Sequence, residues 1–591
     1  MTPIYFGSAE RPLFGWMHAA PAGAAAPLAV LLCAPLGHED LSTHRGQRAL
    51  ACALSAAGLA VLRFDHAGWG DSADAADAGD PAAQWLASLH VAADTLRQRS
   101  GAPRLALLGV RMGALLAALA ASGRSDVDAL VALLPVTSGR AWLRECRLLA
   151  GDAAPAAADG GAEAVTEVGG LVFDAAAAQA VAALRWPAAG RAPAHALLIE
   201  RDDALAADQA AASLRALGAE VQAERRADLG QLIATAHSSH TPAALIERIV
   251  GWLLARAGAV ASSGLRAAAA PAAPAAVAMA LRVGTVTISE RPVRIGSGPA
   301  LAGVLSQPAR ADRASAPRGL LLLSSGAERR IGPNRLWVRF ARERAAAGDL
   351  VLRLDLAGIG DSDDRPGRDG CDIYDPRHVD DIATALGWLR AEGGARRCDV
   401  VGVCSGAYHA WRAALQGLPL STVVAVNPLV FHWKPGMSLD PTAHAFGQIT
   451  IAAAAGRSLR DPARWARLLR GQVNLPLITA ALAARAGHTA SGWARGAARS
   501  VGWPLADDLA GELHRVAQRG ARLCFVFSEG DPGQRLLAEQ AGRALARLRR
   551  NEQVRLRTIA SADHTFTRLQ ARGALYGALH PLLDDAVGAV A

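Results

Sequence analysis

Short runs of hydrophobic residues alternate along the chain with longer stretches that have a helical pattern of polar and apolar positions. LAVLLCA at 28–34 and GLLLLSS at 319–325 are typical of these runs, since each has the length of one strand. Strands that are apolar on both faces are typical of mostly parallel sheets covered by helices on both sides. The pattern therefore predicts an α/β protein. No run approaches the roughly 18 consecutive apolar residues of a membrane-spanning helix, so we predict no membrane span.

The chain repeats itself at an offset of 290 residues, since VLRFDHAGWGDSAD beginning at residue 61 recurs as VLRLDLAGIGDSDD beginning at residue 351. Each copy is followed by a strand that runs into a glycine-flanked turn, LALLGVRMG and CDVVGVCSG. A chain of 591 residues also exceeds the roughly 250–300 residues of a single core. We predict a first domain at about 1–258, an Ala/Pro-rich linker at 259–279 and a second domain at 280–591, which shows eight strand-like runs.

Composition and charge exclude several classes of protein. Hydrophobic residues make up 51% of the chain and charged residues 19%, which excludes a disordered chain. The net charge is +9, but basic clusters interleaved with aromatic residues are missing, so we predict no nucleic-acid partner. The seven cysteines form no CxxC pair, which argues against structural zinc and against a disulfide framework. We expect a cytoplasmic protein, because its first residues show no secretory pattern. We also expect no metal and no cofactor.

The pentapeptide GVCSG at 402–406 has the form glycine–x–nucleophile–x–glycine, in which a strand turns sharply into a helix. The residue at the tip takes strained backbone angles, and a Cβ two positions to either side would collide with the neighbouring strand and helix. This frame puts Cys404 at the tip, whereas Ser405 at the tip would put Val403 where a glycine is needed. A neighbouring imidazole and a helix N-terminus can activate a thiol. We predict Cys404 as a nucleophile; the alternative is a small buried cysteine in an inactive enzyme.

An acid and a histidine follow Cys404 in the chain order nucleophile, acid, histidine. Asp531 follows the strand-like run FVFS, and His564 follows the last strand-like run of the chain. A buried carboxylate at Asp531 would orient the imidazole of His564. Glu529 and Asp563 are competing acids, each beside a better-placed neighbour.

Acyl transfer also needs two preorganised N–H donors for the oxyanion. The helix after the elbow offers the N–H of Ser405, and we expect the loop SSGAE to offer the N–H of Ala327. Asp355 and the GIGDS turn after it are expected to be scaffold, because the same turn occurs in both copies.

The first copy departs from this pattern. Its elbow, GVRMG, keeps both glycines but carries Arg111 at the tip, and a guanidinium is not a nucleophile. Alignment of the copies places Gln231 where the second copy has His564, although Asp202 or Asp203 could still hold the acid position. The loss of nucleophile and base argues against hydrolysis here. Either Arg111 binds a carboxylate or phosphate of the substrate, or the first copy is a degenerate structural domain.

A long insertion at about 433–515 is expected to form a lid. Within 433–503, nine basic residues accompany two acidic ones. Arg457 and Arg464 are seven residues apart, a spacing that puts them on one face of a helix. The cluster is either an ordinary solvated helix face or a collar that attracts an anionic substrate or an acidic carrier protein.

These motifs resemble those of the α/β-hydrolase superfamily, and specifically of serine aminopeptidase-like hydrolases. The first copy, with its CAPLGHE loop, resembles the exosortase-associated hydrolases, and the cysteine elbow of the second is similar to that of dienelactone hydrolases and polyester synthases. The resemblance implies two tandem α/β-hydrolase domains, the first degenerate and the second with a helical lid. It implies acyl transfer without naming a substrate, because one fold hosts many reactions.

We therefore expect an enzyme in which Cys404, with His564 and Asp531, takes an acyl group from an ester or thioester and forms an S-acyl enzyme. The acyl group would pass to water or to an acceptor alcohol or amine, and the donor would be free or bound to a carrier protein. Two alternatives stay open: a carboxylic ester hydrolase, and a non-catalytic binding or scaffold protein built from two degenerate domains. The sequence does not specify the acyl group or the oligomeric state.

Overall fold

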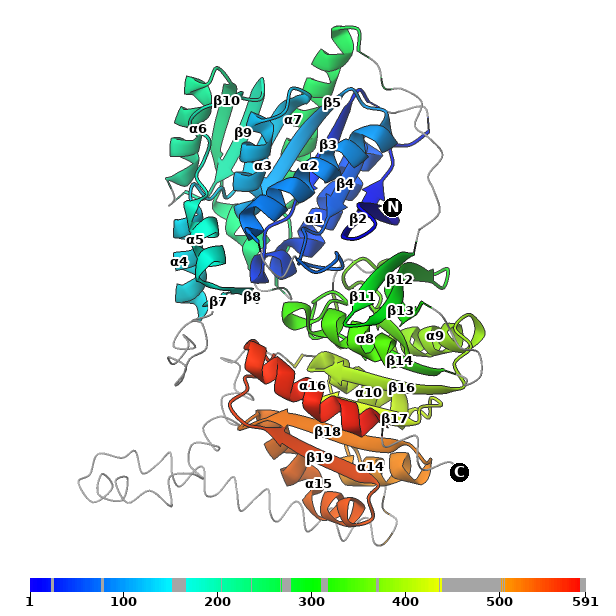
Figure 1. The fold of residues 1–591 in the computed structure, drawn as a ribbon. Helices are drawn as coiled ribbons and strands as arrows, with labels where there is room; N and C mark the ends of the chain where they lie inside the picture. The colour runs from blue at the N-terminus through cyan, green and yellow to red at the C-terminus, as the bar shows by residue number, and fades with distance from the viewer. Residues whose placement is uncertain are drawn as a thin grey trace, which may run out of the picture. The chain divides into compact units, whose positions relative to one another are not determined.

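Two large sheets form the framework of the protein (Figure 1). The structure is a computed structural model and describes residues 1–22, 26–75, 79–150, 166–168, 170–202, 205–234, 236, 238–265, 267, 278–309, 317–367, 371–434, 436–437, 501, 503 and 505–584. Both sheets are mostly parallel and flanked by helices, so the predicted pair of tandem α/β domains is confirmed.

The first sheet has eight strands in the order β1-β2-β4-β3-β5-β6-β9-β10. β1 and β2 run antiparallel to their neighbours, and the other strands are parallel. The strands are β1 Thr2–Gly7, β2 Pro12–His18, β3 Leu28–Cys33, β4 Val61–Phe64, β5 Arg104–Val110, β6 Val127–Leu133, β9 His195–Glu200 and β10 Glu220–Arg225. The helices of this copy are α1 His38–Ala56, α2 Pro81–Ser100, α3 Met112–Ser122, α4 Gly139–Ala150, α5 Ala175–Ala183, α6 Ala206–Ala216, η2 Ala227–Ile233 and α7 Ala243–Ser262, with a hairpin of β7 Thr166–Val168 and β8 Leu171–Phe173.

Strand β3 explains why helices cover both faces of the first sheet. All six of its residues are buried, and successive side chains of a strand point to opposite faces. Leu31 joins a core that includes residues of α2, α3 and α6, whereas Leu32 joins a second core with α1 and α7. The fully apolar run in the sequence thus reflects burial on both faces.

The second sheet has nine strands in the order β11-β12-β13-β15-β14-β16-β17-β18-β19. The strands are β11 Met279–Val283, β12 Val286–Ile295, β13 Leu301–Pro308, β14 Arg318–Leu323, β15 Leu350–Leu354, β16 Arg397–Val403, β17 Thr422–Val426, β18 Arg522–Ser528 and β19 Val554–Ile559. The helices are η3 Pro333–Arg335, α8 Leu336–Ala346, α9 His378–Ala391, α10 Ser405–Leu415, α14 Leu509–Gln518, α15 Pro532–Arg550 and α16 Leu569–Asp584. The expected number was eight; the additional strand, β11, begins at the end of the Ala/Pro-rich stretch and pairs with β12.

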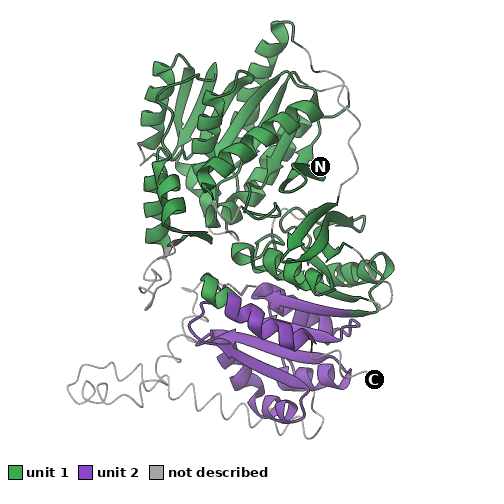
Figure 2. Cartoon of the chain, in the orientation of Figure 1, with its two compact units in different colours: residues 1–397, 567–572 green, residues 398–566, 573–591 purple. Residues whose placement is uncertain are grey.

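By packing, the chain divides into two compact units (Figure 2). Unit 1 comprises residues 1–397 and 567–572, and unit 2 comprises residues 398–566 and 573–591. The predicted domain limits stay a prediction: α7 ends at Ser262 and β11 begins at Met279. Most of the predicted lid lies outside the described residues, and α14 covers its end. Among the described residues, no helix is long and apolar enough to cross a membrane.

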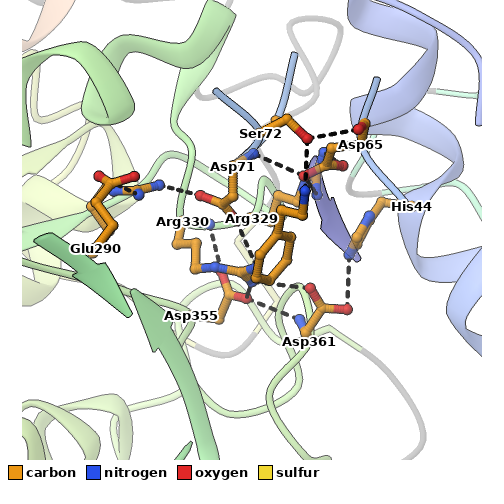
Figure 3. Close-up of polar contacts among 12 residues, drawn as sticks. His44, Asp65, Asp71, Ser72, Glu290, Arg329, Arg330, Asp355 and Asp361 are labelled. Carbon is orange, nitrogen blue, oxygen red and sulfur yellow. Dashed lines mark hydrogen bonds and ion pairs between the residues drawn. The ribbon is translucent and has the colours of Figure 1, made fainter. Parts of the chain in front are cut away.

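The repeated sequence folds into the same turn in both copies (Figure 3). In the first copy the carboxylate of Asp65 accepts a hydrogen bond from the backbone N–H of Asp71 at 2.8 Å, and its carbonyl accepts one from Ser72 Oγ at 2.6 Å. The corresponding residues of the second copy make the same bonds at 2.9 and 2.6 Å: Asp355, Asp361 and Ser362. The scaffold role expected for Asp355 agrees with this geometry.

Candidate active site

The elbow of the second copy connects β16 to α10, with Cys404 at its tip. Cys404 has φ 55° and ψ −115°, and its N–H donates to the carbonyl of Val426 at 2.9 Å. A Cβ on Gly402 would lie only 2.2 Å from the carbonyl oxygen of Gly406, so glycine is required there. Ser405 is the first residue of α10 and not the tip, and backbone N–H groups in the first turn of a helix point out of its end.

Asp531 and His564 form a hydrogen-bonded pair. His564 Nδ1 lies 2.7 Å from Asp531 Oδ2, and the side chain of Asp531 is 1% exposed. The other carboxylate oxygen of Asp531 accepts the backbone N–H of Gly533 at 2.8 Å, at the start of α15. Because both oxygens are engaged, the carboxylate is held in one orientation and presents a defined acceptor to the imidazole.

The second ring nitrogen of His564, Nε2, is buried and makes no hydrogen bond of regular geometry with another described residue. Burial disfavours the charged imidazolium, but the interactions with Asp531 and with Cys404 outweigh it and raise the pKa of His564 to about 10. Cys404 therefore contributes to the raised pKa of the imidazole that Asp531 orients.

Asn427 supports the loop that carries His564. It follows β17 directly, is fully buried and has φ 46°. Its Nδ2 donates to the backbone carbonyl of His564 at 2.7 Å and to Ser528 Oγ at 3.2 Å, and its Oδ1 accepts the N–H of Ser528 at 2.8 Å. Asn427 thus connects the ends of β17 and β18 to the histidine loop. The sequence analysis missed it, although a polar residue that ends the apolar run TVVAV was a usable signal.

The family comparison agrees with the fold and the elbow. Residues 41–162 match the family model described as serine aminopeptidase, S33. The match covers β4, β5 and the elbow of the first copy. This segment is similar to the α/β-hydrolase superfamily. The resemblance to this superfamily is thereby confirmed, with the matched segment in the copy that carries Arg111 and not in the copy that carries Cys404.

Solved structures similar to this chain include an esterase and a phospholipase. An esterase from Pyrococcus furiosus, Pf2001, is 15% identical over 50% of this chain and 92% of its own, with a TM-score of 0.30. Est1E from Butyrivibrio proteoclasticus is 16% identical over 44% of this chain and 100% of its own, with a TM-score of 0.32. A membrane phospholipase A described as a bacterial virulence factor is 18% identical over 51% of this chain and 87% of its own, with a TM-score of 0.29. No curated protein matches the chain.

The competing acids differ from Asp531 in burial and partners. Glu529 is exposed, whereas Asp531 is buried. The carboxylate of Asp563 accepts hydrogen bonds from the N–H and the hydroxyl of Thr565. Of the three acids, Asp531 is the one with a hydrogen bond to the imidazole of His564.

In the first copy, Arg111 is at the tip of an elbow with nearly the same backbone geometry, φ 53° and ψ −120°. Its Nε donates to Glu39 at 2.7 Å, and a second guanidinium nitrogen contacts Glu145. Glu39 also accepts the indole N–H of Trp142 at 3.1 Å. Two carboxylates of the chain itself therefore engage the guanidinium. This favours the structural interpretation of Arg111 over the binding of a substrate anion.

The other residues predicted from the sequence are placed as follows. Ala327 lies in the loop between β14 and α8, within unit 1, and Gln231 lies in η2. Arg457 and Arg464 lie outside the described residues, as does Asp203. Within the described part of the chain, no group of three or more His, Cys, Asp or Glu side chains could hold a metal ion.

Proposed function

We propose that the hydrolase transfers acyl groups from esters or thioesters with Cys404 as the nucleophile, His564 as the acid–base and Asp531 as the residue that orients the imidazole. Two features together support this proposal: Cys404 has strained backbone angles at the tip of the elbow, and the buried carboxylate of Asp531 orients the imidazole of His564. The raised pKa of His564, about 10, supports an imidazolium beside the sulfur at neutral pH.

In the acylation step, the thiolate of Cys404 attacks the carbonyl carbon and forms a C–S bond, while the carbonyl π electrons move to oxygen. The tetrahedral oxyanion then collapses, the bond to the leaving group breaks, and the imidazolium of His564 donates its Nε2 proton to the departing alcohol or thiol. The products of this step are an S-acyl enzyme, the free alcohol or thiol, and a neutral imidazole.

In the deacylation step, the neutral imidazole of His564 removes a proton from water, or from an acceptor alcohol or amine, as that oxygen or nitrogen attacks the thioester carbonyl. Collapse of the second oxyanion breaks the C–S bond and restores the thiolate and the imidazolium. A thioester donor suits this sequence, because exchange of one thiol for another in the acylation step is nearly isoenergetic. Carboxylic ester hydrolysis is the nearest alternative reaction.

We also propose that the backbone N–H groups of Ser405 and Ala327 donate hydrogen bonds to the oxyanion and stabilise it. We further propose that the insertion containing Arg457 and Arg464 attracts an anionic substrate or an acidic carrier protein. The support for this is the excess of basic residues in its sequence. A cytoplasmic location stays a prediction.

The test is intact-protein mass spectrometry after brief exposure to a panel of acyl esters and acyl thioesters. Wild type should gain the mass of one acyl group, and Cys404→Ala should gain none. Cys52→Ala is the matched control, because Cys52 is the exposed cysteine of the described chain, and this variant should acylate as wild type does. An adduct of equal yield on Cys404→Ala would refute the proposed nucleophile.

Alkylation by iodoacetamide distinguishes an inactive site from a wrong substrate. Rapid alkylation of Cys404 without an acyl adduct would indicate that the site is reactive and that the panel lacks the substrate. Alkylation no faster than that of the buried cysteines, together with no adduct, would favour the non-catalytic scaffold.

A further inference from the structure

The loop between β14 and α8 contains three arginines that are buried despite their charge. Arg329, Arg330 and Arg335 are 3%, 0% and 4% exposed. A buried guanidinium is costly unless carboxylates and hydrogen-bond acceptors surround it. The identity of those acceptors therefore indicates what holds this loop in place.

Most of the acceptors come from the first copy. Arg329 Nη2 lies 2.8 Å from Asp40 Oδ2, on α1. It also lies 2.8 Å from Asp65 Oδ1, directly after β4 (Figure 3). At the other end of the loop, the guanidinium of Arg335 donates to the carbonyls of Gly68, Gly70 and Ser72 at 2.9–3.0 Å. The first copy thus holds the loop at both ends.

Between these two arginines, Arg330 joins the turns of both copies. Its guanidinium lies 2.7 Å from Asp71 of the first copy, 2.7 Å from Asp355 and 2.9 Å from Asp361 of the second (Figure 3). It also lies over the ring of Phe14, 5.3 Å from the centroid. Asp65 and Asp71 therefore serve two purposes, since they form their own turn and also bind the arginines of the loop.

The same loop carries Ala327, two residues before Arg329. Ser325 Oγ donates to Glu328 at 2.8 Å, and the N–H of Glu328 donates back to the carbonyl of Ser325 at 3.0 Å, which closes a tight turn around Ala327. Ala327 also lines a small cavity, about the size of one water molecule, together with residues of the first copy. Those residues are Leu41, His44, Arg45 and Ala236. Ala327 thus lies in a tight turn and lines a cavity that residues of the first copy also line.

We propose that the first copy, which lacks a nucleophile of its own, is a positioning domain that holds the oxyanion loop of the second copy through the contacts of Asp40 and Asp65 with Arg329. This inference rests on the proposed function, in which the N–H of Ala327 stabilises the oxyanion. It gives a role to the buried carboxylates of Asp40 and Asp65 in a copy whose elbow carries Arg111 at the tip. Asp40 and Asp65 touch no reacting atom and act through Arg329 on the loop.

Asp40→Asn in the full chain is the primary test. It keeps the shape of the side chain and removes one of the two negative charges that face Arg329. The matched control is Asp349→Asn: Asp349 is also buried and bound by two arginines, Arg318 and Arg344, but it precedes β15, at the amino end of the strands. Acylation should fall by about tenfold or more in Asp40→Asn, because displacement of a catalytic donor by about 1 Å costs up to ~100-fold. In Asp349→Asn acylation should stay within about twofold of wild type.

Two further measurements separate positioning from general destabilisation. Iodoacetamide alkylation of Cys404 forms no oxyanion, so its rate should be unchanged in Asp40→Asn while acylation slows. Hydrogen exchange of the peptide spanning 324–332 should become faster in Asp40→Asn and not in Asp349→Asn. If Asp40→Asn folds poorly, Trp69→Phe is a milder variant, because it removes the other partner of Asp40, an indole N–H at 2.8 Å, without touching Arg329.

The inference is overturned if Asp40→Asn acylates within twofold of wild type, or if Asp349→Asn loses as much acylation. A parallel fall in alkylation and acylation would also overturn it, since the nucleophile itself would then be affected. Failure of the proposed function has a different signature: wild type would then form no Cys404-dependent adduct at all. That result, together with alkylation of Cys404 no faster than that of the buried cysteines, would remove both proposals.

Discussion

Replacing Asn427 by leucine should slow acylation of Cys404, because Asn427 supports the backbone of the histidine loop. The first copy provides the precedent for this substitution. Leu134 follows β6 as Asn427 follows β17, and it has φ 49° against 46°. The backbone N–H groups of both residues donate to the next strand at 2.9 Å. Leucine is therefore compatible with this backbone, and the amide of Asn427 is what the variant loses.

The magnitude follows from the groups that would be left without a partner. Asn427→Leu removes the acceptor of the buried Ser528 N–H and the donor to the His564 carbonyl, and each such loss costs about 1–3 kcal/mol. We expect the free energy of unfolding to fall by about 2–6 kcal/mol. If the imidazole shifts by about 1 Å, the acylation rate constant should fall by up to ~100-fold.

The assay measures the acylation rate by mass spectrometry at saturating acyl donor, alongside urea denaturation. Asp399→Ala is the matched control, because Asp399 accepts the N–H of Thr422 at 2.8 Å between β16 and β17 at their amino ends. It should lower stability similarly and leave acylation within about twofold of wild type. Acylation by Asn427→Leu within twofold of wild type, or an equal loss in Asp399→Ala, would refute the positioning role of Asn427.

Three further predictions concern the pKa of His564, Arg111 and the contact between the copies. The pKa of His564 is about 10 in the folded protein and about 6.5 in the unfolded chain. The contribution of His564 to the free energy of unfolding is therefore complete below about pH 6.5 and is lost as the pH rises through 10. Cys404→Ala should lower the pKa of His564 in an NMR titration. Arg111→Met should lower the melting temperature, because two carboxylates lose their partner, while the mass assay shows acylation within about twofold of wild type. Arg353→Met should cost about 3–5 kcal/mol in urea denaturation, since the fully buried Asp71 loses one of its two cations.

The elbow and the acid–histidine pair could be predicted because local backbone geometry is encoded in the glycines and in chain order. Gly402 is required by a contact within one strand-to-helix turn, so the sequence identifies Cys404 as the tip. Asp531 and His564 each follow a strand end, and the carboxyl ends of parallel strands lie at one edge of a sheet. Their hydrogen bond agrees with that expectation, while their catalytic role stays a proposal.

Long-range pairings could not be predicted in the same way. Arg111 reaches Glu39 and Glu145, which are 72 and 34 residues away, and no local pattern specifies either partner. From the sequence alone, the guanidinium could equally bind a substrate anion. The same holds for Arg329 and Asp40, which are 289 residues apart. Such pairs depend on how the copies pack, and packing is not encoded in the spacing of neighbouring residues.

The contact between the copies is reciprocal. This explains why the first copy has the repeated turn although its elbow carries no nucleophile. Arg63 of the first copy lies 2.8 Å from Asp361 of the second, and the equivalent Arg353 contacts the equivalent Asp71. Exchange of the same contact in both directions is the pattern of a two-fold symmetric interface. Each turn therefore binds the other copy as well as completing its own loop. The tip of the first elbow has no part in this exchange, so Arg111 can stand there without weakening it. A substitution at Asp71, by contrast, would remove one carboxylate from each of two buried arginines of the second copy, Arg330 and Arg353.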